Sequence, residues 1–223
     1  MSRPYGPLRR IFQAALALAA TICAEVAAPA QAEPLRALAF GDSLTAGLGL
    51  PLDAAFPAQL EKRLVADGFD VKVVNAGVSG ETTAGGLARF SYTFQDDADL
   101  VILELGANDM LRGLDPKAAR ENLDRIIVAA KEKGAGVVLA GMIAGANYGP
   151  EYKQAFDAIY PDLARRHGLP LYPFFLEGVA GDPQFVLDGL HPNALGVQRI
   201  VSGVAPLVEK SLSEIRAERA KPR

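Results

Sequence analysis

One serine follows a short apolar segment near the start of the chain, in the order Leu38-Ala39-Phe40-Gly41-Asp42-Ser43. The apolar run is typical of a buried strand, and the Gly41-Asp42 pair that ends it indicates a sharp turn into a helix. Ligands of open α/β sheets bind at the carboxyl ends of strands, so Ser43 is placed to act as a nucleophile if a base reaches it. The alternative is that Asp42 and Ser43 only cap the next helix.

The chain has two histidines that could be this base, His167 and His191. His191 lies in Asp188-Gly189-Leu190-His191-Pro192, where the Asp188 carboxylate is close enough in sequence to hold one ring nitrogen while the other faces a hydroxyl. The same segment could instead cap the last helix. His167 ends a helix in Arg165-Arg166-His167-Gly168, where a partly cationic ring suits the helix dipole, and it is interpreted as structural.

Two further loops carry groups that can stabilise a negative charge. In Asn75-Ala76-Gly77-Val78-Ser79-Gly80, the glycines allow backbone N–H groups to point at an anion, although such turns are often purely structural. Asn108 in Gly106-Ala107-Asn108-Asp109 can donate its side-chain amide, or can serve only as a cap with Asp109. A nucleophile, a base with its carboxylate and a set of N–H donors are what acyl transfer requires.

Short apolar runs alternate with helical segments from Leu35 onward. Strands are predicted at 35–40, 71–75, 100–105, 136–141 and 169–172, and helices at 54–67, 82–94, 115–133, 150–167 and 194–217, with a kink or break at Pro206. The charged tail from Glu214 is expected to fray. This alternation predicts an α/β domain with a parallel sheet of about five strands and helices on both faces. Because parallel strands end at one edge, the polar loops are expected to converge there.

The composition excludes several classes of protein. Half of the 223 residues are apolar and the net charge is −3, which suits one globular core and gives no basic surplus for nucleic acid. The sequence has no cluster of metal ligands and no phosphate-binding glycine loop with a lysine, so neither a metal nor a cofactor is expected. The single cysteine, Cys23, excludes an internal disulfide.

The first 32 residues have the pattern of a secretory signal peptide. Arg3, Arg9 and Arg10 precede an apolar run over 11–24, and Ala30-Gln31-Ala32 fits a cleavage site before Glu33. The run is too short for a spanning helix, which needs about 20 residues. We therefore expect a signal peptide at 1–32 and an exported domain at 33–223, in the periplasm or the medium and without stable membrane insertion.

The four polar segments, taken in order, resemble a known family. GDSL, NAGVSG, GAND and DGLH are similar to the four signature blocks of the SGNH (GDSL-type) hydrolases, and NYGPEYKQAFDAIYPDLA with LPLYPFF resembles their bacterial periplasmic thioesterase, lysophospholipase and arylesterase branch. The resemblance covers about 35–208 and implies a flavodoxin-like three-layer α/β/α sandwich. It implies that Ser43 is the nucleophile, His191 the base and Asp188 the orienting acid. It also implies an oxyanion hole made by Ser43, Gly80 and Asn108, with Asp42 and Asp109 supporting the loops and Gly77 structural.

The acyl group of such a substrate needs an apolar groove near Ser43. Residues expected at this edge of the sheet, each of which could also be ordinary core, are Met110, Leu111, Leu114, Ile143, Phe174, Phe175 and Leu190. The predicted activity is hydrolysis of aryl and acyl esters, lysophospholipids and acyl thioesters by a monomer. The alternatives are a carbohydrate acetylesterase of the same fold and a non-catalytic flavodoxin-like binding protein.

Overall fold

Five parallel strands form the central sheet, in the order β2-β1-β3-β4-β5. Their bounds are β1 Leu35–Gly41, β2 Val71–Gly77, β3 Leu100–Glu104, β4 Gly136–Ala140 and β5 Leu171–Tyr172. The structure is a computed structural model that describes residues 33–94 and 98–221, so the predicted signal peptide lies outside the described residues. The strand order is the flavodoxin-like one. After β2 is added on one side of β1, the later strands are added on the other side, and ligands of such sheets bind at this switch point between β1 and β3.

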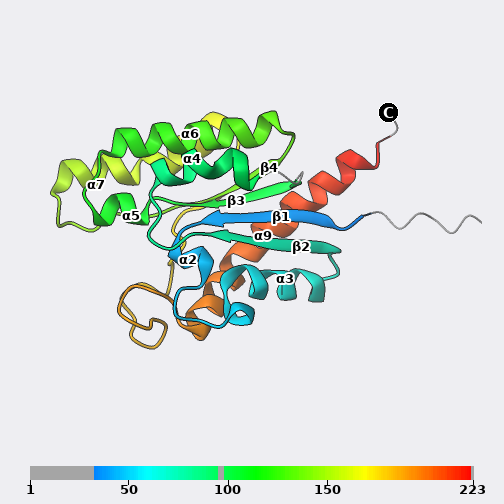
Figure 1. The fold of residues 1–223 in the computed structure, drawn as a ribbon, viewed down its shortest axis with the longest axis horizontal. Helices are drawn as coiled ribbons and strands as arrows, with labels where there is room; N and C mark the ends of the chain where they lie inside the picture. Colours follow the sequence, from blue (N-terminus) through cyan, green and yellow to red (C-terminus); the bar gives the residue numbers. More distant parts are fainter. Residues whose placement is uncertain (1–32, 95–97, 222–223) are drawn as a thin grey trace, which may run out of the picture. The chain divides into compact units, whose positions relative to one another are not determined.

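Helices cover both faces of the sheet and give three layers (Figure 1). On one face α3 (Phe56–Ala66) packs against α9 (Ala194–Arg219). The other face carries α4 (Thr83–Thr93), α6 (Pro116–Glu132), α7 (Pro150–Asp157) and α8 (Ile159–His167). Two short helices follow strand ends, α2 (Ser43–Ala46) and α5 (Ala107–Leu111), and the 3₁₀ turn η1 (Leu52–Ala54) lies between α2 and α3. The predicted three-layer α/β/α class is confirmed.

The apolar pattern of the sequence accounts for these layers. All residues of β3 are buried, as expected for a strand that is covered on both faces. Each helix instead buries one side; in α6 the buried side includes Leu123, Ile126 and Ile127. Of the helices that the structure describes, none is long and apolar enough to cross a membrane.

The first three strands end at the same level. Gly41 of β1 lies in register with both Gly77 of β2 and Glu104 of β3. A side chain at Gly41 would place its Cβ 2.1 Å from the Thr45 hydroxyl and 2.6 Å from the Glu104 carbonyl, so only glycine permits this close turn. The three loops that follow therefore leave the sheet side by side.

The segment predicted as one helix over 150–167 is two helices, α7 and α8, which meet at Ala158. Pro161 lies in the first turn of α8 and has no N–H to donate to the carbonyl of Asp157. The helical hydrogen bonds are therefore interrupted between the two segments.

The last helix is more continuous than predicted. α9 continues through Pro206 without a break, and it packs against both α3 and the sheet. The tail expected to fray from Glu214 is helical to Arg219. The Arg216 guanidinium donates to the Asp70 carbonyl at 3.1 Å, and Arg219 pairs with Asp99. Tertiary contacts thus hold a segment whose local sequence is charged.

Candidate active site

Ser43 is the first residue of α2, directly after the turn that ends β1. The cap of this helix is Asp42, whose Oδ1 accepts the N–H of Leu44 at 3.0 Å. The Ser43 hydroxyl is therefore not needed for capping. Its backbone N–H lies in the first turn, where no helical carbonyl is available to accept it, so it can donate to an anion.

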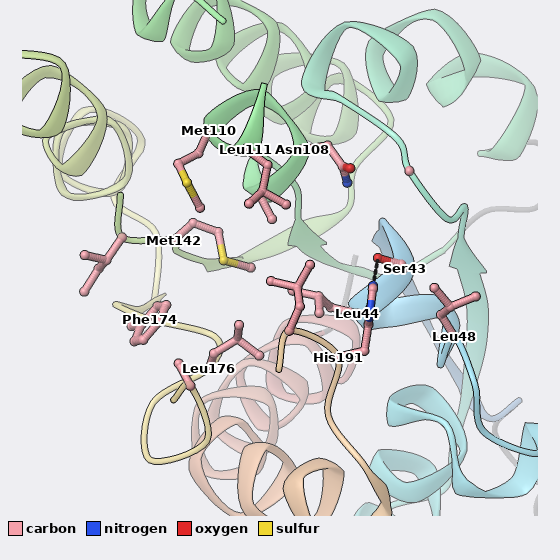
Figure 2. A pocket seen from close by; sticks show the side chains of 15 residues that line it. Ser43, Leu44, Leu48, Asn108, Met110, Leu111, Met142, Phe174, Leu176 and His191 are labelled. Atoms are coloured by element: carbon pink, nitrogen blue, oxygen red, sulfur yellow. Dashed lines mark hydrogen bonds between the residues drawn. The ribbon is translucent and has the colours of Figure 1, made fainter. Parts of the chain in front are cut away.

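A continuous chain of hydrogen bonds runs from Ser43 to Asp188. Ser43 Oγ lies 3.0 Å from His191 Nε2 (Figure 2), and His191 Nδ1 lies 2.8 Å from Asp188 Oδ2. The other carboxylate oxygen accepts the N–H groups of His191, at 2.8 Å, and of Leu190, at 3.0 Å. These hydrogen bonds, that of the His191 backbone above all, hold the pKa of Asp188 well below its ordinary value. An ionised, fixed carboxylate therefore orients the imidazole with its other nitrogen toward the serine.

The turn that carries Asp188 and His191 is closed by its own backbone. Val186 and Pro192 form an isolated antiparallel bridge, and the N–H of Leu187 donates to the His191 carbonyl at 2.8 Å. This hairpin-like closure, which we call the base hairpin (186–192), fixes the spacing of the carboxylate and the imidazole.

Two other donors face the same space as Ser43. Gly80 has φ +80°, and its carbonyl accepts a hydrogen bond from the Arg112 guanidinium at 2.8 Å; no acceptor among the described residues takes its N–H. Asn108 donates one amide hydrogen to Asp42 Oδ2 at 3.0 Å, which leaves the second for another acceptor. Ser43, Gly80 and Asn108 all line one cavity.

Three buried carboxyl groups support these loops: Asp42, Glu104 and Asp109. Asp109 accepts the N–H of Thr83 at 2.8 Å and its hydroxyl at 2.7 Å, which ties α5 to the start of α4. Burial raises the pKa of Asp42 to about 6, and it raises the pKa of Glu104 well above its ordinary value. The family resemblance implies the supporting role of Asp42 and Asp109, but it does not single out Glu104 within an apolar strand.

An apolar cavity of about 340 Å³ opens beside Ser43 and His191. Five of the seven predicted groove residues line it: Met110, Leu111, Ile143, Phe174 and Leu190. Six further lining residues were not predicted from the sequence: Leu44, Leu48, Ala107, Met142, Leu176 and Ala180. Figure 2 shows Met142, Phe174 and Leu176 on one side of the Ser43–His191 pair and Leu48 on the other. Their positions come from the folding of separate loops, and no local signal marks them.

Phe175 and Leu114 do not line the cavity. Phe175 is fully buried, and its ring packs edge-on against Phe56 with centroids 5.0 Å apart. Its N–H donates to the Gly141 carbonyl at 2.8 Å, while Phe174, whose carbonyl accepts the Glu177 N–H at 3.0 Å in the turn that follows, takes the cavity side. Leu114 is partly exposed beyond the end of α5.

His167 and Gly77 have structural surroundings. The His167 ring lies 2.6 Å from Asp124, away from the residues that line the cavity. A Cβ at Gly77 would lie 2.3 Å from the Ala46 nitrogen, so this glycine permits β2 to pack against α2. Within the described parts of the chain, no group of three or more His, Cys, Asp or Glu residues could hold a metal ion.

The sequence model of the GDSL-like Lipase/Acylhydrolase family matches residues 39–199, which include every residue of this site. The chain belongs to this family. It is 41% identical to Esterase TesA of Pseudomonas aeruginosa over 184 residues, which are 82% of this chain and 92% of the relative. It is also 42% identical to Thioesterase 1/protease 1/lysophospholipase L1 of Escherichia coli K12, over 70% of this chain and 74% of the relative.

Solved structures of GDSL-like acylhydrolases agree with this assignment. AlinE4, described as an SGNH-hydrolase family esterase, is 44% identical to this chain and superimposes with a TM-score of 0.68 over 82% of this chain and 98% of its own. The three relatives described here are thus named as esterases or as a thioesterase and lysophospholipase.

Proposed function

We propose that the protein is a serine esterase that hydrolyses carboxylic esters with an apolar acyl group, including lysophospholipids and aryl esters, and acyl thioesters. The observation that carries this proposal is the Ser43–His191–Asp188 chain of hydrogen bonds beside an apolar cavity. Family membership and the esterase, thioesterase and lysophospholipase names of the relatives support it.

In the proposed reaction, His191 Nε2 takes the proton of Ser43 Oγ while Oγ attacks the carbonyl carbon. The N–H groups of Ser43 and Gly80 and the free amide hydrogen of Asn108 stabilise the oxyanion. His191 then protonates the leaving alcohol or thiol. A water molecule, deprotonated by His191, attacks the acyl carbonyl, and His191 returns that proton to Ser43 Oγ as the carboxylic acid is released. Asp188 stays ionised and stabilises the imidazolium throughout.

The cavity favours an acyl chain over a sugar. Apart from Ser43, Asn108 and His191, its walls are glycine, alanine, leucine, isoleucine, methionine and phenylalanine. Such a lining offers a carbohydrate few hydrogen-bonding partners, whereas it removes the methylene groups of a fatty acyl chain from water at about 0.8 kcal/mol each. The acetylesterase alternative therefore has less support.

The test is a series of nitrophenyl esters from acetyl to palmitoyl, with acyl thioesters, a lysophospholipid and an acetylated sugar alongside. The Ser43→Ala variant is the blank, and a serine-directed phosphonate followed by mass spectrometry of peptides identifies the nucleophile. We expect hydrolysis of the acyl substrates and a label on Ser43. Hydrolysis of the acetylated sugar alone would support the acetylesterase, and absence of both hydrolysis and label would support a binding protein.

We also propose that the protein is exported and works as a monomer in the periplasm or the medium. The support is the signal-peptide pattern at 1–32 in the sequence. Cell fractionation and the N-terminal sequence of the mature protein test it: a mature terminus at Glu33 is expected, and retention of all 223 residues in the cytoplasm would contradict it. Light scattering gives the oligomeric state.

A further inference from the structure

Glu104 is a buried acid that the proposed reaction does not use. It is the last residue of β3, and none of its surface is exposed. Its Oε2 accepts the Thr45 hydroxyl at 2.7 Å and, more weakly, the Asp42 N–H at 3.4 Å. Its Oε1 is buried and has no hydrogen-bond partner among the described residues.

The surroundings of Glu104 do not favour a charge. Asp42 faces it from the turn before α2, and Tyr160 of α8 faces it with a hydroxyl that donates to the Leu105 carbonyl at 2.8 Å. Arg89 of α4 donates instead to the carbonyl of Gly41 and pairs with Glu81. A buried carboxylate without a cation nearby is unfavourable. Either Asp42 or Glu104 is therefore expected to remain protonated.

The hydrogen bonds indicate which acid holds the proton. Asp42 accepts two N–H groups, from Leu44 and from the Asn108 amide, and both bonds favour its ionised form. Glu104 has one oxygen that no donor faces, which is where a proton can reside. The negative charge thus belongs on Asp42 and the proton on Glu104 Oε1.

We propose that Glu104 is a positioning residue that works as a neutral carboxylic acid. It holds Thr45 and the Asp42 backbone, and by remaining neutral it lets the ionised Asp42 side chain orient the Asn108 amide toward the oxyanion. The effect on turnover rests on the proposed esterase function, whereas the protonation state of Glu104 does not.

The pKa directions agree with this assignment. Desolvation raises the pKa of Glu104 well above its ordinary value, and it raises that of Asp42 to about 6, which agrees in direction with a proton on Glu104 and a charge on Asp42. The folded protein then binds a proton at Glu104 that the unfolded chain, with an ordinary glutamate, has lost. The resulting stability is complete in acid and is lost as the pH rises toward the folded pKa.

The first test measures proton uptake on folding, from the pH dependence of the unfolding free energy between pH 6 and 8. The Glu104→Gln variant is expected to take up fewer protons on folding than wild type, with a difference of at most one. Glu132→Gln, which alters an exposed glutamate of α6, is expected to leave the uptake unchanged. Equal uptake in wild type and Glu104→Gln would overturn the proposal, whether or not the protein hydrolyses esters.

The second test compares turnover. Glu104→Gln retains a neutral group of the same shape and is expected to keep kcat within about threefold of wild type at neutral pH, while Glu104→Leu, which leaves Thr45 and the Asp42 N–H without an acceptor, lowers kcat at least about tenfold with little change in KM. A Glu104→Gln enzyme as impaired as Glu104→Leu would show that the carboxylate is required and would overturn the proposal. If Glu104→Leu does not fold, the proposal is tested by the proton uptake and the kcat of Glu104→Gln.

Discussion

The two histidines of this protein each contact an aspartate, yet their surroundings differ completely. His191 lies 2.8 Å from Asp188 through Nδ1 and 3.0 Å from Ser43 through Nε2. His167 lies 2.6 Å from Asp124 through Nε2, and Lys131 donates to its carbonyl at 3.0 Å. The first pair lies between two loops at the carboxyl edge of the sheet. The second lies where α8 ends, just before β5 begins, at the amino edge.

The comparison shows that an Asp–His pair is not in itself a catalytic device. Three strands end in register at the carboxyl edge, and the loops after them bring a hydroxyl, N–H donors and an apolar cavity to the imidazole. At the amino edge the same pair connects α6 to α8, and neighbouring contacts such as Asp99–Arg219 also join one element to another. The difference between the edges can be tested by matched substitutions.

The largest contrast is expected between the two histidines. His191→Ala removes the proposed general base and should lower kcat by about 10⁴-fold or more. His167→Ala should leave kcat within about twofold and lower the unfolding free energy by about 1 kcal/mol, the usual net contribution of a hydrogen bond. Ester kinetics and urea unfolding of both variants provide the measurement. A similar loss of kcat in both would remove the distinction between the two edges.

Two asparagines sharpen the comparison within the carboxyl edge. Asn108→Ala removes a proposed oxyanion donor and should lower kcat by about 10²–10³-fold with KM little changed. Asn122 of α6 donates to the Thr83 hydroxyl at 3.1 Å and does not line the cavity, so Asn122→Ala should leave kcat near that of wild type. If Asn108→Ala instead changes only KM, Asn108 binds substrate and transition state equally.

The cavity wall should affect selectivity and not the chemical step. Ala180→Phe places an aromatic ring in the cavity and is expected to lower kcat/KM for a lauroyl ester by about tenfold or more relative to a butyryl ester. Ala118→Phe, at an exposed position of α6, is the matched control and should not alter this ratio. An equal loss on both esters would indicate that Ala180→Phe disturbs the catalytic groups themselves.

The smallest effects on activity are expected at the amino edge. Asp99 is buried and accepts the Arg36 N–H at 2.8 Å as well as pairing with Arg219. Asp99→Ala should lower the unfolding free energy by about 1–3 kcal/mol, since it leaves a backbone N–H without its acceptor. Arg219→Ala should cost less than about 1 kcal/mol, because the arginine side chain is half exposed. Thermal unfolding and kcat of both variants test this, and a loss of kcat in either would contradict the separation of the edges.

The succession of strands and helices along the chain, and the polar groups at the strand ends, could be predicted from the sequence. Ser43 and Asn108 follow apolar runs closely, so their place at one edge follows from parallel strands. Asp188 and His191 lie in the long connection between β5 and α9, and parallel strands alone do not fix their position. The cavity wall could be predicted only in part. Phe174 and Phe175 are adjacent residues of the same type, and the sequence alone does not distinguish them. Only the folded turn shows that Phe174 faces the cavity and that Phe175 packs against Phe56.

Glu104 and the helices were harder to predict for a different reason. A single acid at the end of an apolar run gives no periodic signal. The role of Glu104 becomes apparent only from its hydrogen bonds to Asp42 and Thr45 in the folded protein. Local rules for proline succeed or fail with the tertiary setting: the helix is divided before Pro161 but continues through Pro206, where packing on α3 and the sheet supports it. Propensity is a weak constraint when a whole helix face is buried.

The base hairpin has a consequence for how this enzyme can change. Phe174, Leu176 and Ala180, which form part of the cavity wall, lie in the same connection as Asp188 and His191. The Val186–Pro192 bridge and the Leu187–His191 hydrogen bond close the hairpin independently of that wall. Leu190 of the hairpin also lines the cavity, and Asn193 donates to the carbonyls of Gln184 and Phe185 just before the hairpin. Exchanges confined to 174–181 can therefore alter substrate choice while the Asp188–His191 pair is retained.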